Sequence, residues 1–386
     1  SERALAEYIV HRLSKAGLDA YLQEVEPGRP NAVGVRPGTG GGRSLLFTGH
    51  MDTSYDGDES HLSGAGYRAH AVCDGDWIWG LGANNMKSGL AAALVVIEAL
   101  AAEDVSLPGD VVYGAVVGET EKSAVDDFAG PRMSGYGVGT RHLILHGVTG
   151  DYAVLCEPTG LKVCHANMGV IWVKITTSGT IGHSALSRRP GTINAIEAMH
   201  AVQSHLTSWI NAYEAAHVYL GEQPNVTISA IRGGLPWRAS RNPYECHMYL
   251  DIRTVPGVSP DDVKRSLREH LSLLVPQQLA KQPEVRIYVN DPATELAVDH
   301  PIITAARAAH LQATGSEPDV AIRRFGSDAT HMNRYGVPCV TYGPGGRVHP
   351  TAKGLDNEHV NLENMSIAAR VYLAMALDIC SRRADV

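Results

Sequence analysis

The feature that most constrains the fold is a set of short apolar runs, each followed almost at once by a chemically active polar residue. The runs and their polar residues are 44–48 before His50, 111–117 before Glu119, and 154–155 before Glu157. An apolar helix over 88–102 lies between two of them. Buried strands alternating with apolar helices predict an α/β fold, a mostly parallel sheet with helices on both faces. Because ligands bind at the carboxyl ends of parallel strands, we expect His50, Glu119 and Glu157 to form a site there.

The pattern changes near residue 168, where a different arrangement of elements begins. The expected strands are 170–176, 226–231, 245–253 and 285–289, and the expected helices are 192–216 and 259–274. The helix over 259–274 should begin at an N-cap, Ser259, with Pro260 in its first position. The order βαββαβ is typical of a ferredoxin-like α+β domain. We therefore expect an inserted domain over 168–290, within a first domain made of 1–167 and 291–386.

Charge and cysteine usage exclude several classes of protein. The 33 Lys and Arg residues against 41 Asp and Glu give a formal net charge of −8, which argues against nucleic-acid and membrane partners. The longest apolar stretch contains Glu98 and is too short to span a bilayer. No signal peptide is visible, and the six cysteines form no CxxC pair. These features favour a cytoplasmic protein with reduced thiols.

Several short motifs of chemically active residues occur in a fixed order along the chain. They are Gly49-His50-Met51-Asp52-Thr53, the run 80–89 (GLGANNMKSG), Gly118-Glu119-Thr120-Glu121, Glu157-Pro158-Thr159, 326–329 (GSDA) and 343–349 (GPGGRVH). Inside the expected insertion, Gly182-His183-Ser184-Ala185, residues 191–196 and Asp251-Ile252-Arg253 join them. Each motif taken singly is compatible with a purely structural role, so their joint order carries the argument.

Together these motifs resemble the family that contains acetylornithine deacetylase, succinyl-diaminopimelate desuccinylase, aminoacylase and glutamate carboxypeptidase. The resemblance covers nearly the whole chain, including the insertion. It implies a zinc-peptidase-like fold and a metal-dependent hydrolase of C–N bonds in small carboxylated substrates. It also implies a homodimer formed through the inserted domain.

The same resemblance implies roles for the residues at the strand ends. His50 and Glu157 would ligate one metal ion, with Asp52 as the supporting carboxylate of His50. Glu119 would be the general base, and His349 would ligate a second ion. Zn, Mn, Co and Fe all suit imidazole and carboxylate ligands.

Four further residues would act on the substrate, again by resemblance. His183, from the inserted domain, would reach the site of a neighbouring subunit and polarise the substrate oxygen. Arg253, Asn225 and Gly345 would help to hold the substrate carboxylate.

The sequence departs from the family pattern at the second metal position. Asn85 stands where the family has a bridging aspartate, and Thr120 replaces a metal-binding glutamate. Glu121 could compensate; a shifted register with Glu121 as ligand and Thr120 at the base position is less attractive because it loses the base. Two divalent ions about 3.5 Å apart repel by about 19 kcal/mol at an effective dielectric constant of about 20, and a neutral amide offsets far less of this than a carboxylate. We therefore expect one tightly held ion per chain.

Three functions remain open on the sequence alone. The first is hydrolysis of an amide in a small carboxylated molecule. The second is aminohydrolase chemistry, in which water displaces an amine and releases ammonia, as in a nitroanthranilate-type deaminase. The third is a binding protein that has kept the fold without catalysis, against which the retention of His50, Glu119 and Glu157 argues.

Overall fold

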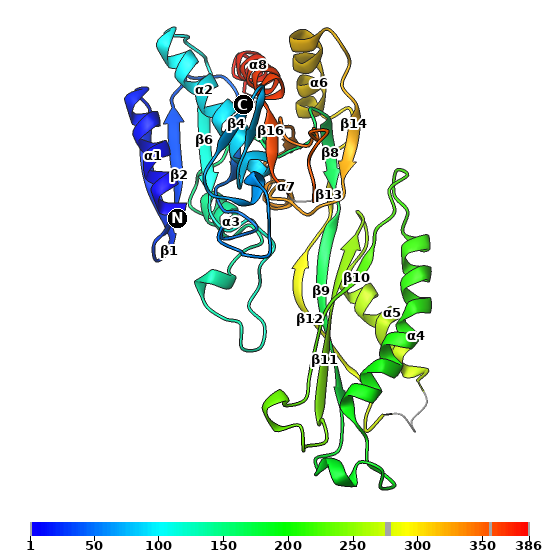
Figure 1. The fold of residues 1–386 in the computed structure, drawn as a ribbon. Helices are drawn as coiled ribbons and strands as arrows, with labels where there is room; N and C mark the ends of the chain where they lie inside the picture. The colour runs from blue at the N-terminus through cyan, green and yellow to red at the C-terminus, as the bar shows by residue number, and fades with distance from the viewer. Residues whose placement is uncertain (1, 275–278, 355–356, 385–386) are drawn as a thin grey trace. The chain divides into compact units, whose positions relative to one another are not determined.

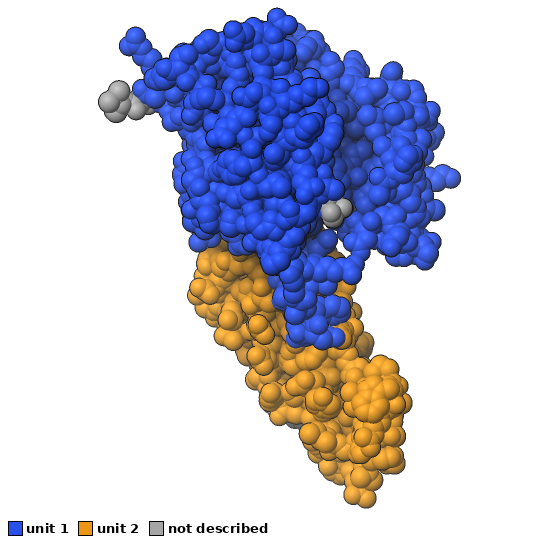
Figure 2. Space-filling view, turned by 90° about the vertical axis from the view of Figure 1, so that its left-hand side faces the viewer, with its two compact units in different colours: residues 1–166, 295–323, 327–386 blue, residues 167–294, 324–326 orange. Residues whose placement is uncertain are grey.

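The computed structural model describes residues 2–274, 279–354 and 357–384 (Figure 1). The chain divides into two compact units, coloured separately in Figure 2. Unit 1 comprises residues 1–166, 295–323 and 327–386, and unit 2 comprises 167–294 with 324–326. The second unit therefore extends a few residues beyond the expected insertion at 168–290, and it includes a short segment after Arg323 that the sequence did not suggest.

Unit 1 is built on one large sheet whose central strands are parallel. Its strands follow the order β1-β2-β6-β3-β7-β15-β8-β13, and β14 also pairs with β8. The four strands β6, β3, β7 and β15 are parallel, whereas β1, β2 and β8 pair antiparallel at the flanks. The strands are β1 (Asp19–Glu26), β2 (Arg29–Arg36), β3 (Leu45–His50), β6 (Val111–Val116), β7 (Tyr152–Leu155), β8 (Val163–Asn167), β13 (Thr294–Glu295), β14 (Val320–Arg323) and β15 (Cys339–Thr341).

Helices cover both faces of this sheet, as the apolar strands predicted. Along β3, Leu45 and Phe47 join one hydrophobic cluster and Leu46 joins another, as the two-residue period of a strand requires. The first cluster includes helices α1 (Glu2–Lys15), α2 (Ser88–Ala102), α6 (Pro301–Thr314) and α8 (Leu362–Ile379), and the second includes α3 (Val138–Leu145) and α7 (Ala329–Arg334). The site-bearing strands are thus fixed between two packed cores.

Among the described residues, one helical stretch, Ala83–Ala102, is long and apolar enough by composition to cross a membrane, with a mean hydropathy of 1.4. Its side chains Leu90 and Ile97 are buried in the first cluster, as in the core helix of a globular domain. A small sheet of β4 (Val72–Asp74), β5 (Trp77–Trp79) and β16 (His359–Asn361) completes unit 1. The short helices are η1 (Ala65–Tyr67), η2 (Ala83–Lys87), η3 (Pro131–Met133), η4 (Ser184–Leu186) and η5 (Pro236–Arg238).

Unit 2 has the βαββαβ order that the sequence predicted. Its elements are β9 (Gly169–Ser178), α4 (Ala195–Ala216), β10 (Val226–Gly233), β11 (Glu245–Thr254), α5 (Pro260–Ser272) and β12 (Glu284–Asp291). The sheet order is β10-β11-β9-β12, all antiparallel, which is the ferredoxin-like arrangement. The predicted cap of α5 is present, because the Ser259 hydroxyl accepts a hydrogen bond from Asp261 N at 3.2 Å and Pro260 follows it.

Candidate metal centre

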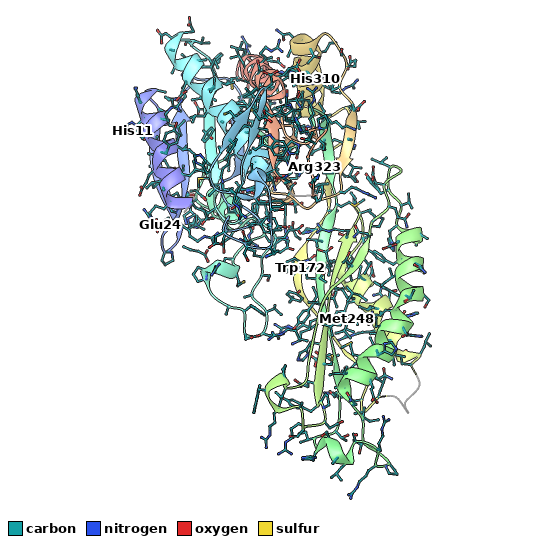
Figure 3. All side chains as sticks on the ribbon, in the orientation of Figure 1. His11, Glu24, Trp172, Met248, His310 and Arg323 are labelled. Atoms are coloured by element: carbon teal, nitrogen blue, oxygen red, sulfur yellow. The ribbon has the colours of Figure 1, made fainter. Side chains whose placement is uncertain are left out.

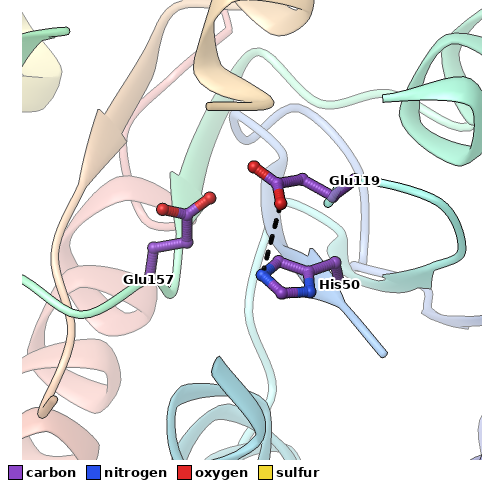
Figure 4. A group of neighbouring side chains, drawn as sticks. All are labelled: His50, Glu119 and Glu157. Atoms are coloured by element: carbon purple, nitrogen blue, oxygen red, sulfur yellow. Dashed lines mark ion pairs between the residues drawn. The ribbon is translucent and has the colours of Figure 1, made fainter. Parts of the chain in front are cut away.

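The carboxyl ends of three neighbouring strands bring His50, Glu119 and Glu157 together. His50 is the last residue of β3, Glu119 follows β6, and Glu157 follows β7; β6 and β7 each pair parallel with β3. One ligand atom from each of the three side chains lies within 4.8 Å of the other two. Figure 4 shows the two carboxylates and the imidazole turned toward a common region. His50 and Glu157 are buried and Glu119 is nearly so, which makes this an enclosed polar site.

The imidazole of His50 is oriented by Asp52 so that its second nitrogen faces the other site residues. Nδ1 lies 3.0 Å from the backbone oxygen of Asp52, to which it donates. Nε2 in turn lies 3.1 Å from Asn85 Oδ1 and 3.5 Å from Glu119 Oε2. An imidazole nitrogen, an amide oxygen and a carboxylate oxygen in this arrangement are ligand types that suit a divalent cation.

The carboxylate of Asp52 holds the segment that carries Glu119. It accepts hydrogen bonds from the backbone N–H of Glu119 (3.1 Å), the backbone N–H of Thr120 (2.9 Å) and the Thr120 hydroxyl (2.6 Å). Burial raises the pKa of Asp52, but His50 and these hydrogen bonds outweigh it, and the pKa is lowered overall. The closer contact of Asp52 to His50 Nδ1 is through its backbone oxygen, since the carboxylate is 3.6 Å away. Asp52 therefore positions both the imidazole of His50 and the backbone segment that carries Glu119.

Asn85 is held in place by a buried acid that the sequence analysis missed. The backbone N–H groups of Asn84 and Asn85 donate to Glu358 Oε2 at 3.1 and 2.8 Å. Burial raises the pKa of Glu358, and these N–H groups together with Lys87 oppose that rise. This anchoring fixes the segment from which Asn85 faces His50.

Glu157 uses its two carboxylate oxygens differently. Oε2 forms an ion pair with the Arg323 guanidinium, while Oε1 is buried and has no hydrogen-bond partner within residues 2–274, 279–354 and 357–384. Burial lowers the pKa of Arg323 to about 10, with Glu119 opposing, so the guanidinium remains charged at neutral pH. A buried carboxylate oxygen without a partner is costly, and a metal ion is the partner that this arrangement fits.

The turn that contains Gly345 packs against both metal-site segments. A Cβ at Gly345 would come within 2.7 Å of the Asn84 backbone oxygen, and one at Gly343 within 2.4 Å of the Glu157 backbone oxygen. Gly346 N donates to Asn84 Oδ1 at 2.7 Å. The glycines therefore serve close backbone packing around the site; a contact of Gly345 with substrate stays a prediction.

His349 and Glu121, the ligands expected for a second ion, are not part of the three-residue group. The His349 ring lies 5.0 Å from the Trp77 ring and 5.3 Å from the Trp79 ring, and its Nδ1 is 2.8 Å from the Thr351 hydroxyl. Glu121 is exposed. Thr120 stands where the resembling family has a metal ligand, and its hydroxyl donates a hydrogen bond to the Asp52 carboxylate. Within the described residues, the group that converges in this region is His50, Glu119 and Glu157, with Asn85 beside His50, and its donor types fit a divalent ion.

The substrate residues expected in unit 2 occupy separate local environments there. His183 is exposed, and its Nδ1 accepts from Ala185 N at 3.1 Å. Arg253 makes a two-pronged contact with Asp251, at 2.8 and 3.0 Å. Asn225 is exposed and donates to the Thr227 hydroxyl at 3.2 Å. Their action on a substrate stays a prediction.

The sequence analysis did not identify Glu358 or Arg323 as site residues. It included Asp328 in the 326–329 motif but assigned it no role. Asp328 accepts from the Thr140 hydroxyl at 2.6 Å, and burial, followed by Glu119, raises the pKa of Asp328 to about 7. Arg323 ends β14, so the strand-end rule that found His50 would have found it, had the four-residue strand been recognised. Glu358 lies just before the short strand β16 and gave no such signal.

Comparison with known proteins bears on the whole chain. The model of Peptidase family M20/M25/M40 matches residues 46–378. An N-formyl-4-amino-5-aminomethyl-2-methylpyrimidine deformylase of Bacillus subtilis is 23% identical over 99% of this chain and 90% of that protein. An acetylornithine deacetylase of Aliivibrio fischeri is 27% identical over 75% of this chain and 71% of that protein.

Solved structures share the fold. A tripeptidase from Staphylococcus aureus aligns with a TM-score of 0.74 at 16% identity, covering 97% of this chain and 92% of that one. A metallo-carboxypeptidase from Sulfolobus solfataricus aligns with a TM-score of 0.72 at 16% identity, covering 98% and 94%. At these identities the structures establish the architecture alone.

Proposed function

Because the chain belongs to Peptidase family M20/M25/M40 and is a metal-dependent hydrolase of C–N bonds, we propose that it cleaves an amide in a small carboxylated molecule with a single divalent ion. The observation that carries the proposal is the buried group of His50, Glu119 and Glu157 at adjoining strand ends. Zn, Mn, Co or Fe suits this combination of imidazole and carboxylates.

The charge of the site supports one ion per chain. Asp52, Glu119 and Glu157 carry three negative charges, and Arg323, the ion-pair partner of Glu157, carries one positive charge, which leaves a formal charge of −2 over these four side chains. One divalent ion cancels this charge, whereas two would leave an excess positive charge in a largely buried site. Asn85 can offer an amide oxygen to an ion but carries no charge with which to bridge two.

In the proposed reaction, Glu119 is the general base. A divalent ion, when bound, supplies Lewis acidity toward water and the substrate carbonyl. Glu119 takes the proton from the attacking water and later delivers it to the leaving nitrogen. The Asp52 backbone oxygen keeps the His50 tautomer, and the Asp52 carboxylate fixes the backbone of Glu119, so the base is held without a large rearrangement.

A cavity near the site is lined by charges of both signs, and with Arg29 paired to Glu2 and Arg132 paired to Asp56, Lys87 and Lys122 are the cations outside these pairs that could meet an anionic group of the substrate. It has a volume of about 590 Å³ and reaches Asp52 and Thr120. Lys87, Lys122 and Arg132 are among its lining residues. Among the relatives, the names acetylornithine deacetylase and formyl-pyrimidine deformylase suggest N-acetyl and N-formyl compounds as the first acyl groups to test.

A substrate panel with the variant Glu119→Gln tests the proposal. The wild type should release acetate from N-acetylornithine, formate from the N-formyl aminomethylpyrimidine, or a free amino acid from one of a set of dipeptides. Glu119→Gln should lower kcat by at least about 100-fold, the low end for loss of a general base, while metal content stays at the wild-type level. Loss of the metal in this variant would make Glu119 a ligand, and no turnover of any amide by the wild type would reject amide hydrolysis.

Aminohydrolase chemistry is the second candidate, and Asn85 in place of the family carboxylate is the observation that favours it. Ammonia released from an aromatic amino acid such as a nitroanthranilate, without acid release from the amides, would decide for it. A binding protein without catalysis is rejected by any turnover. We also propose that the chain forms a homodimer through unit 2, in which His183 acts in the site of the neighbouring subunit; analytical ultracentrifugation tests the dimer. We propose a cytoplasmic location as well, which cell fractionation tests.

A further inference from the structure

Arg323 is a charged side chain in the site for which the proposed mechanism has no role yet. It ends β14 and is labelled in Figure 3; the residue is 9% exposed. Arginine is almost never buried to this degree without a partner, because the desolvated charge must be compensated. Its partner is Glu157, one of the three residues that could hold the metal ion.

The pairing leaves part of each group available. Glu157 gives Oε2 to the guanidinium, and its Oε1 has no hydrogen-bond partner among the residues described. A guanidinium carries five N–H donors in a rigid fork, so a contact with one carboxylate oxygen does not exhaust it. The carboxylate of Glu157 therefore lies between Arg323 and the candidate metal position. The guanidinium has more N–H groups than this single contact uses.

The surrounding charges explain why a fixed cation belongs here. Two positions that carry acids in the resembling family are neutral in this chain, Asn85 and Thr120, so the means to hold a second ion are reduced. One carboxylate oxygen of Glu119 and one of Glu157 nevertheless lie within 4.8 Å of each other and of a nitrogen of His50. A single divalent ion leaves two positive charges fewer near these carboxylates than a pair of such ions would, and the fixed charge of Arg323 replaces one of the two.

We propose that the Arg323 guanidinium holds one oxygen of Glu157 and donates an N–H to the substrate oxygen as negative charge develops on it. The inference rests on the proposed hydrolysis and makes Arg323 a catalytic residue of it. A preorganised donor in a water-poor site stabilises such an oxyanion strongly. The arrangement needs no change in the protonation of Arg323.

The variants Arg323→Met and Arg323→Lys test this role, with Arg12→Met as the control. Arg12 also forms a two-pronged ion pair in unit 1, with Glu98 at 2.6 Å, and it lies on α1 outside the metal centre. Each variant is measured for kcat and KM on the amide that the wild type hydrolyses fastest, and for Zn²⁺ affinity by calorimetry on metal-stripped protein.

We expect Arg323→Met to lower kcat by about 100- to 1000-fold, as loss of an oxyanion donor does, with Zn²⁺ affinity equal to or tighter than the wild type. Tighter binding follows because Glu157 loses a competing cation. Added guanidinium ion should restore part of kcat in Arg323→Met. Arg323→Lys keeps the charge and should stay within about tenfold of the wild type, and Arg12→Met should match the wild type.

Two results would overturn the assignment. An unchanged kcat in Arg323→Met excludes contact with the reacting oxygen. A parallel loss of Zn²⁺ affinity and kcat without rescue makes Arg323 a positioning residue for Glu157 only. If Arg323→Met does not fold, Arg323→Lys decides, since a folded, metal-loaded lysine variant without turnover contradicts the charge role. Wild-type turnover tests the proposed function separately, because these outcomes are ratios to an active wild type.

Discussion

The two halves of the paired-metal site that the family resemblance implies differ in how the chain holds them. His50, Glu119 and Glu157 stand at the ends of parallel strands packed between two cores, and their ligand atoms converge within 4.8 Å. His349 lies on the segment between β15 and β16, where its ring contacts Trp77 and Trp79. Strand ends are positioned by a whole sheet, whereas a loop residue is positioned by its local neighbours.

The chemistry of the two halves differs in the same direction. The strand-end half keeps its acids and contains a buried carboxylate oxygen without a partner among the described residues. The other half has Asn85 and Thr120 in place of acids, and the Thr120 hydroxyl is bonded to Asp52. A half that is short of negative charge is poorly suited to a second divalent ion.

The largest expected effect separates the two halves directly. His50→Ala and Glu157→Gln should each weaken binding of the tight ion by at least about 100-fold, more than loss of an outer-shell partner does. His349→Ala should weaken it by less than tenfold. Calorimetric titration of metal-stripped protein measures all three, and an equal loss in His349→Ala and His50→Ala would remove the distinction.

Restoring charge to the weaker half should sharpen the comparison. Asn85→Asp supplies the bridging carboxylate that the family carries and should raise the metal content from one toward two ions per chain. The matched control is Asn84→Asp, because Asn84 is the preceding residue and accepts from Gly346 N instead of facing His50. Metal analysis after dialysis distinguishes them, and one ion in both variants would show that charge at position 85 is not the limiting factor.

The smallest expected effect concerns Asp328, a buried acid whose pKa is raised by burial and by the nearby charge of Glu119. Because the pKa of Asp328 is raised to about 7 from 3.8, the ionised carboxylate destabilises the fold, and stability present below about pH 4 is lost as pH rises through 7. The shift corresponds to an upper limit of about 4 kcal/mol. Asp328→Asn, which keeps an acceptor for Thr140, should remove this loss.

Urea unfolding of metal-stripped protein at pH 5 and pH 8 measures that difference. The stability lost between the two pH values should be smaller in Asp328→Asn than in the wild type. Asp378→Asn is the control, since Asp378 lies near the end of α8 and forms an exposed ion pair with Arg382, which follows that helix. Equal pH dependence in the wild type and Asp328→Asn would contradict the raised pKa.

The sequence predicted those features that follow from periodicity and order. Apolar runs ending at His50, Glu119 and Glu157 predicted the central parallel strands, and the βαββαβ order predicted unit 2. The antiparallel pairing at the flanks was not foreseen. β8 and β14 have too few residues for a clear pattern, and for the eight-residue strands β1 and β2 periodicity indicates a strand but not the direction in which it pairs. The strand-end rule works where a run is long enough to be recognised.

The partners within the site were harder to predict than its members. Glu358 is 273 residues from Asn85 in the chain, and Arg323 is far from Glu157, so no local pattern joins them. The sequence also could not tell that His50 would donate to the backbone of Asp52 while the Asp52 carboxylate took the Thr120 hydroxyl. Such choices depend on three-dimensional donors and acceptors rather than on spacing.

The central claim is that the strand-end half holds one ion and the other half holds none tightly. Metal analysis of freshly purified wild-type protein, after dialysis against metal-free buffer and with the chain concentration measured independently, tests it most directly. The account predicts about one divalent transition-metal ion per chain. Two retained ions per chain would contradict it, and would show that Asn85 and Thr120 do not prevent a paired site.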